Sequence, residues 1–94
     1  MSYKLRFHEL ALIEWNKLDG SIRTPLKKKL AERLQNPRVL SAALSGMPDC
    51  YKIKLKGLGY RLVYRVEADI LFITVIAVGK RDRNQVYVAA QDRL

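Results

Sequence analysis

The segment from Tyr51 to Val66, YKIKLKGLGYRLVYRV, carries five cations and no acidic residue. Apolar residues stand at about every second position, which predicts a two-stranded ribbon with the cations between them on one face of a sheet. These cations are Lys52, Lys54, Lys56, Arg61 and Arg65. Residues two apart in a strand lie about 6.6 Å from each other on one face, so Lys52 and Lys54 are expected to be neighbours. Such a surface suits a polyanion such as RNA.

A cationic patch of this kind could bind RNA or cleave it. Cleavage by internal attack needs a base for the ribose 2′-OH, cations for the charge on the phosphate and an acid for the leaving 5′-oxygen. Neither histidine nor glutamate is expected near the patch, so catalysis would use a lysine whose pKa is lowered by neighbouring cations. The alternative is that the lysines form the solvated face of an amphipathic strand.

The apolar segment after the ribbon, residues 70–78, predicts a strand in the sheet interior. If this strand pairs with residues 60–66, its end brings Lys80, Arg81 and Arg83 close to the lysines. The last helix would add Tyr87, whose ring either packs at the helix boundary or supports an unstacked base. Stacking of that kind contributes about 1–3 kcal/mol per base.

The other elements follow from periodicity. Residues 2–7 alternate as a strand, and residues 10–18 carry a helical stripe that ends at Asp19-Gly20. A second helix is predicted from about Ser21 to Asn36-Pro37, with Pro25 in its first turn. Lys27, Lys28 and Lys29 point outward from this helix, beside a stripe of Ile22, Leu26, Leu30 and Leu34.

Residues 38–50 predict an irregular loop from which Leu40, Leu44 and Met47 reach the core. The turn of the ribbon falls at 57–59, where glycines reach positive φ. A second turn is expected at 67–69, and Asp82 with Gln85 suggests a capping box for the last helix. His8 is expected at a helix start, and Cys50 and Trp15 in the core.

Length and composition limit the classes of protein. A chain of 94 residues predicts one domain over residues 1–94 with one apolar core. The net charge of +9 favours nucleic acid or an acidic protein as partner. No apolar run reaches the ~18 residues of a membrane span, and the start has no secretory h-region, so a cytoplasmic protein is expected. One cysteine and one histidine predict neither a disulfide nor a metal or other cofactor.

Several segments closely resemble the RelE toxins of the RelE/ParE superfamily. They are WNKLDGSIR (15–23), GMPDCYKIKL (46–55), GYRLVY (59–64), VGKR (78–81) and VY (86–87). The resemblance runs from about Tyr3 to Leu94. It implies a small single-domain α/β (α+β) fold of the microbial-ribonuclease kind. Such a fold has a mostly antiparallel four-stranded sheet, two N-terminal helices and a C-terminal helix.

The resemblance also implies a function, that of the toxin in a type II toxin-antitoxin system. Such a toxin is an endoribonuclease that needs no metal and cleaves messenger RNA in the A site of the 70S ribosome, beside 16S ribosomal RNA, leaving a 2′,3′-cyclic phosphate. An acidic RelB-type antitoxin would neutralise it by covering or displacing the last helix, which would move Tyr87 away. Operator DNA would be contacted only indirectly, through the antitoxin complex, and no membrane is involved.

Residue roles carry over by position. Lys52 and Lys54 would serve as base and as electrostatic stabiliser, with their order left open. Arg61 would hold the scissile phosphate, Arg81 would assist the leaving group, and Tyr87 would stack on a base. Ser45 replaces a basic residue of the family, whose contact could pass to Lys56 or Arg83. Further RNA contacts are expected from Lys56, Arg65, Lys80, Arg83, Lys27, Lys28 and Lys29.

Two other functions remain open at this point. A gyrase inhibitor of the ParE kind would use the same fold through a protein interface. A non-catalytic RNA-binding module would use the same cations without cutting.

Overall fold

A four-stranded sheet forms the centre of the computed structural model, which describes residues 2–82 and 84–94. The strands are β1 (Lys4–Phe7), β2 (Cys50–Leu55), β3 (Tyr60–Glu67) and β4 (Phe72–Lys80), in the spatial order β1-β4-β3-β2. β1 runs parallel to β4, and the two other pairings are antiparallel. This confirms the mostly antiparallel sheet expected from the sequence, and it makes β2 an edge strand.

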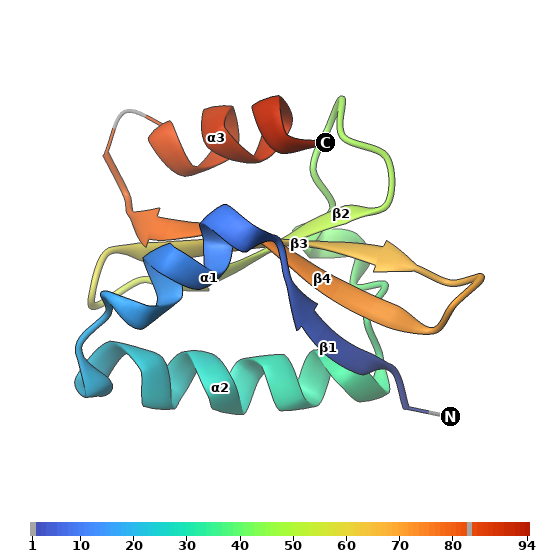
Figure 1. Ribbon diagram of the computed structural model, residues 1–94, viewed down its shortest axis with the longest axis horizontal. Coiled ribbons are helices and arrows are strands. Elements are labelled where there is room, and N and C mark those ends of the chain that lie inside the picture. The colour runs from blue at the N-terminus through green and yellow to red at the C-terminus, as the bar shows by residue number, and fades with distance from the viewer. Residues whose placement is uncertain (1, 83) are drawn as a thin grey trace.

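Helices cover both faces of the sheet (Figure 1). The first face carries α1 (Glu9–Asn16) and α2 (Gly20–Gln35), which bury Trp15, Leu26 and Leu30 among the strand side chains. The second face carries α3 (Gln85–Arg93), which buries Val86 and Ala90. The sheet therefore divides the apolar core into two clusters, because both of its faces are packed.

The helix starts differ from the expectation in two places. Pro25 lies in the second turn of α2, not in the first, since the helix begins at Gly20. A proline there leaves the carbonyl of Ser21 without its helical partner; Ser21 is exposed, so water can supply one. The capping box is wrong as well: α3 begins at Gln85, Asn84 is its N-cap with φ of 60°, and Asp82 lies before the cap.

The strand and loop boundaries also need correction. The interior strand spans 72–80 and not 70–78, because Ile70 and Leu71 belong to a turn in which Leu71 has φ of 57°. The loop before β2 contains a short 3-10 helix, η1 (Leu40–Ala42). Met47 is buried as expected, but Leu40 is 86% exposed, and Ala42 of η1 is buried instead. His8 caps α1 through its Nδ1, which accepts a hydrogen bond from the Leu10 N–H.

Candidate RNA-binding and catalytic site

The proposed site begins as a row of residues across three strands. Lys54 of β2 pairs with Arg61 of β3, and Arg61 pairs with Gly79 of β4. Lys52 pairs with Val63, one step further along the same face. This is the face that α3 packs on, because Val63 belongs to the cluster that holds Val86 and Ala90. On this face α3 packs against β3 and β4, and Lys52 and Lys54 on β2 stay partly exposed.

Crowding among the cations changes the acidity of one lysine. The charge of Lys52 lowers the pKa of Lys54 below its ordinary value, and partial burial, Arg61 and Lys56 act in the same direction. A lysine with a lowered pKa is a better base near neutral pH, since more of it is unprotonated. The direction of this pKa shift is the one that a lysine base requires, and the catalytic role of Lys54 stays a prediction.

Arg61 is buried to an extent that its place in an alternating strand did not predict. Its side chain is 6% exposed, and Nη1 donates to the main-chain carbonyl of Tyr60 at 3.0 Å. Next to it, Gly79 lies close under α3: a Cβ at this glycine would stand 3.4 Å from Cγ2 of Val86. The small residue thus lets the start of α3 lie directly on the row that contains Arg61.

Tyr87 is partly buried and packs against the same cluster as Val63 and Met47. Val63 pairs with Lys52 on this face of the sheet. Tyr87 therefore packs at the helix boundary, which is one of the two alternatives that the sequence left open, and stacking on a base stays a prediction.

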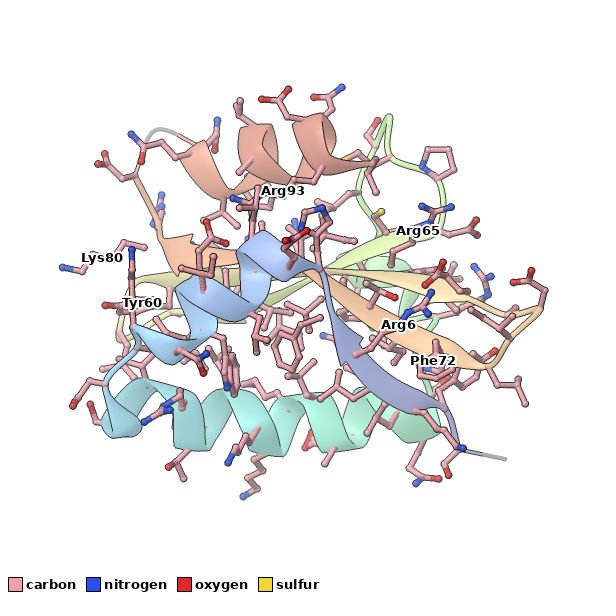
Figure 2. The ribbon with its side chains drawn as sticks, in the orientation of Figure 1. Arg6, Tyr60, Arg65, Phe72, Lys80 and Arg93 are labelled. Carbon is pink, nitrogen blue, oxygen red and sulfur yellow. The ribbon has the colours of Figure 1, made fainter. Side chains whose placement is uncertain are left out.

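The end of β4 brings further cations to the same end of the sheet. Lys80 pairs with Tyr60, and Figure 2 shows the two residues together at that end. The Arg81 N–H donates to the Gly59 carbonyl at 2.6 Å, which fixes Arg81 at the turn of the ribbon, near the exposed Lys56. Arg83 lies outside the described residues.

One predicted contact lies elsewhere. Arg65 shares its face with Arg61 but pairs with Cys50 and Thr74, at the opposite end of the sheet from Lys80 (Figure 2). It lines a small hollow with Asp49, so an acidic group lies near it. Arg65 is not part of the cluster, because four residues of extended strand separate it from Arg61 by about 13 Å.

The three lysines of α2 differ in their distance from the proposed site. Lys27, Lys28 and Lys29 are all exposed, as predicted. Of these, Lys29 lines a hollow at the β2 edge together with Lys52 and Lys54. The structure therefore brings one helix lysine to the proposed site.

Arg33 is a residue that the sequence analysis missed. Its Nη1 donates to the Lys52 carbonyl at 3.1 Å and to the Tyr64 hydroxyl at 2.8 Å. That hydroxyl in turn donates to the Pro37 carbonyl at 2.7 Å. These bonds tie the edge strand to α2 at Lys52. The spacing of Arg33, four residues after Lys29, puts both on one helix side and was the available signal.

A second missed feature is the ion pair between Glu14 of α1 and Arg93 of α3. Nη1 of Arg93 donates to Oε1 of Glu14 at 2.8 Å, and Nη2 donates to Oε2 at 2.9 Å. Arg93 also donates to the Ile76 carbonyl at 2.9 Å, and Glu14 accepts from the Val78 N–H at 3.2 Å. Figure 2 shows Arg93 between α3 and α1. The two residues are 79 positions apart in sequence, so no local pattern predicts the ion pair.

Residues 2–82 and 84–94 contain neither a cluster of metal ligands nor a membrane-spanning helix. In that part of the chain there is no cluster of three or more His, Cys, Asp or Glu side chains placed to bind a metal ion. No helix in the same part has the length and apolar character of a membrane span.

The fold and the site define a small α+β protein with a lysine- and arginine-rich site at the β2 edge of its sheet. The sequence model for "ParE toxin of type II toxin-antitoxin system, parDE" matches residues 5–85. The "mRNA interferase toxin RelE" of Escherichia coli K12 is 53% identical over 94 residues, covering 100% of this chain and 99% of that protein. The chain therefore belongs to the RelE/ParE family of toxins.

Solved structures agree. An E. coli RelE variant in the free state superposes with a TM-score of 0.92 at 51% identity, covering 100% of this chain and 99% of that one. In the intact E. coli RelBE toxin–antitoxin complex, the matching chain has a TM-score of 0.84 at 54% identity. That match covers 87% of this chain and 100% of the other. These matches confirm the fold expected from the resemblance.

Proposed function

We propose that this protein is the toxin of a type II toxin-antitoxin system, an endoribonuclease that cleaves messenger RNA in the ribosomal A site. The observation that carries the proposal is the row of Lys54 and Arg61 beside Lys52, in a chain 53% identical to an mRNA interferase. Messenger RNA in the A site of the 70S ribosome is the substrate, 16S ribosomal RNA is a second contact, and the cytoplasm is the place of action.

The chemistry is internal attack of a 2′-OH on the adjacent phosphate. Lys54 takes the proton of the 2′-OH, since its pKa is the one that Lys52 lowers. Lys52 and Arg61 stabilise the charge that grows on the phosphate, and the burial of Arg61 strengthens its effect. Arg81 supports the leaving 5′-oxygen. The 5′-oxygen leaves with the electron pair of its bond to phosphorus and takes up the proton that Lys54 accepted, which restores Lys54. The products are a 2′,3′-cyclic phosphate and a free 5′-OH, so no water or metal is consumed.

Tyr87 positions the RNA in this scheme. Tyr87 lies in the first turn of α3, where it packs against the second core cluster but stays partly exposed, so its ring can support a base. A free nucleotide chain would seldom hold the in-line geometry that attack requires. The ribosome supplies that geometry, which explains why a site without histidine or glutamate suffices.

The partner that neutralises the toxin is an acidic antitoxin of the RelB type. The net charge of +9 favours an acidic chain. Such a partner contacts operator DNA, and the toxin reaches that DNA only through it.

Expression in a growing culture tests the proposal. The parent is expected to arrest growth and to produce messages cut within codons, with new 5′ ends that appear only when ribosomes are present. Arg81→Ala/Tyr87→Ala, checked for folding by circular dichroism, should relieve the arrest. A folded double variant as toxic as the parent would exclude this mechanism. Intact messages with stabilised gyrase–DNA breaks would instead identify a gyrase inhibitor, and bound but uncut message would identify an RNA-binding module.

A further inference from the structure

Two hollows lie side by side along the outer edge of β2. The first has a volume of about 310 Å³ and is lined by polar side chains from α2, η1 and β2, namely Lys29, Arg33, Ser41, Lys52, Lys54 and Lys56. The second, about 400 Å³, shares Lys29, Lys54 and Lys56 and continues to the turn of the ribbon at Gly57 and Leu58. The three shared lysines form the boundary between the hollows.

The first hollow has the composition of a phosphate site. Five of its side chains are cationic, and none of the described residues that line it is acidic. Arg33 is held in place because Nη1 bonds the Lys52 carbonyl and the Tyr64 hydroxyl. Among the described residues the hydrogen bonds of this guanidinium come from Nη1, so Nε and Nη2 are available to a ligand. Ser41 adds a neutral donor at the rim.

The second hollow is suited to a base. Leu58 is 51% exposed in the turn, and Gly57 beside it has no side chain to fill the space. An apolar surface next to a cationic one matches a nucleotide, whose flat apolar base lies next to an anionic phosphate. Leu58 belongs to neither core cluster, and contact with a base would explain why a leucine is exposed at this position.

We propose that the two hollows form a subsite for one nucleotide of the substrate RNA, next to the cleaved bond. The phosphate lies between Lys29, Arg33 and Lys52, and the base lies on Leu58. The inference rests on the proposed function, since Lys52 and Lys54 belong both to the hollow and to the cleavage site. This sharing is the reason to assign the subsite to the substrate strand and not to ribosomal RNA.

Binding of a short RNA tests the subsite without the ribosome. The probe is a fluorescent single-stranded RNA hexamer with 2′-O-methyl groups throughout, which cannot be cut by internal attack. Its affinity is measured by anisotropy at several salt concentrations. Lys29→Ala should reduce the slope of log affinity against log salt by about 0.7, the value for one phosphate contact to a single strand. Lys4→Ala is the matched control, because it removes the same charge from an exposed position on β1, at the opposite edge of the sheet from β2, and should leave the slope unchanged.

Leu58→Ser gives an independent readout. It should weaken binding about fivefold at every salt concentration, because it removes about half of the apolar burial of a leucine and no charge. Ile70→Ser, in the turn at the other end of the sheet, changes a residue that is 47% exposed and should have no effect on affinity. Both variants alter exposed turns, and thermal unfolding confirms that they are folded.

The outcomes separate this inference from the proposed function. Equal salt slopes for Lys29→Ala and Lys4→Ala overturn the phosphate position, and unchanged affinity of Leu58→Ser overturns the base position. Failure of the parent to bind the hexamer also overturns the subsite. In each of these cases ribosome-dependent cleavage by the parent would still support the proposed function, whose failure shows instead as intact messages.

Discussion

The ion pair between Glu14 and Arg93 should be a main support of α3. Arg93 makes two bonds to the carboxylate and one to the Ile76 carbonyl. A hydrogen bond to a charged group contributes about 1.5–3 kcal/mol, but solvent reaches the pair, with 14% and 32% of the two side chains exposed. We therefore expect Arg93→Ala to lower the free energy of unfolding by about 2 kcal/mol, less than the sum of its bonds.

The measurement is a double-mutant cycle of Arg93→Ala and Glu14→Ala by urea denaturation. All proteins carry Arg81→Ala so that the producing cells survive. The coupling energy should be about 1.5 kcal/mol, and the melting temperature of each single variant should fall by roughly 8–16 °C. Asp92→Ala on α3 and Glu9→Gln on α1 alter exposed charges of the same helices and should change stability by less than about 0.5 kcal/mol.

The pH dependence follows from the pKa of Glu14. Burial alone would raise this pKa, but the hydrogen bonds from Arg93 and from the Val78 N–H, with the charge of Arg93, lower it below the ordinary value of 4.5. A carboxyl group with a lowered pKa stabilises the fold above its unfolded pKa and loses that contribution as pH falls through the folded value. The stability difference between the parent and Glu14→Gln should therefore be constant near pH ~7 and shrink below pH ~4.5. A coupling energy near zero, or a difference that grows in acid, would refute the assignment.

Three further predictions concern the site and the loop. Lys52→Met should move the rise of the cleavage rate to higher pH, because removing the neighbouring charge raises the pKa of Lys54, and single-turnover cleavage on ribosomes at several pH values measures it. Tyr64→Phe should lower the free energy of unfolding by about 1–2 kcal/mol, since the buried Pro37 carbonyl loses its donor; urea denaturation that shows no loss would contradict the network. Leu40→Ser should change stability by less than about 0.5 kcal/mol in the same assay, because the side chain is largely exposed.

Much of the fold was predictable because its signals are local. Alternation with period two identified the ribbon, and steps of four placed Ile22, Leu26 and Leu30 inside. The interior position of the long strand followed from its apolar composition. The predicted starts of β4 and α3 were wrong for a local reason. Leu71 and Asn84 have positive φ, so these non-glycine residues form turns that sequence propensity does not predict.

The sequence by itself determined the candidate side chains for the proposed chemistry, which are the alternating lysines and Arg61, and it led us to expect no histidine or glutamate among them. Only the tertiary structure decided how they are arranged. Because β2 is an edge strand, Lys29 and Arg33 of α2 lie beside Lys52 and Lys54. Arg65 lies further along β3, opposite Cys50, and is therefore distant from these lysines. Tertiary packing also buried Arg61, which its place in an alternating strand did not predict. The physical reason is range: periodicity fixes neighbours within a few residues, whereas contacts between α1, α2, α3 and the sheet depend on how separate elements pack.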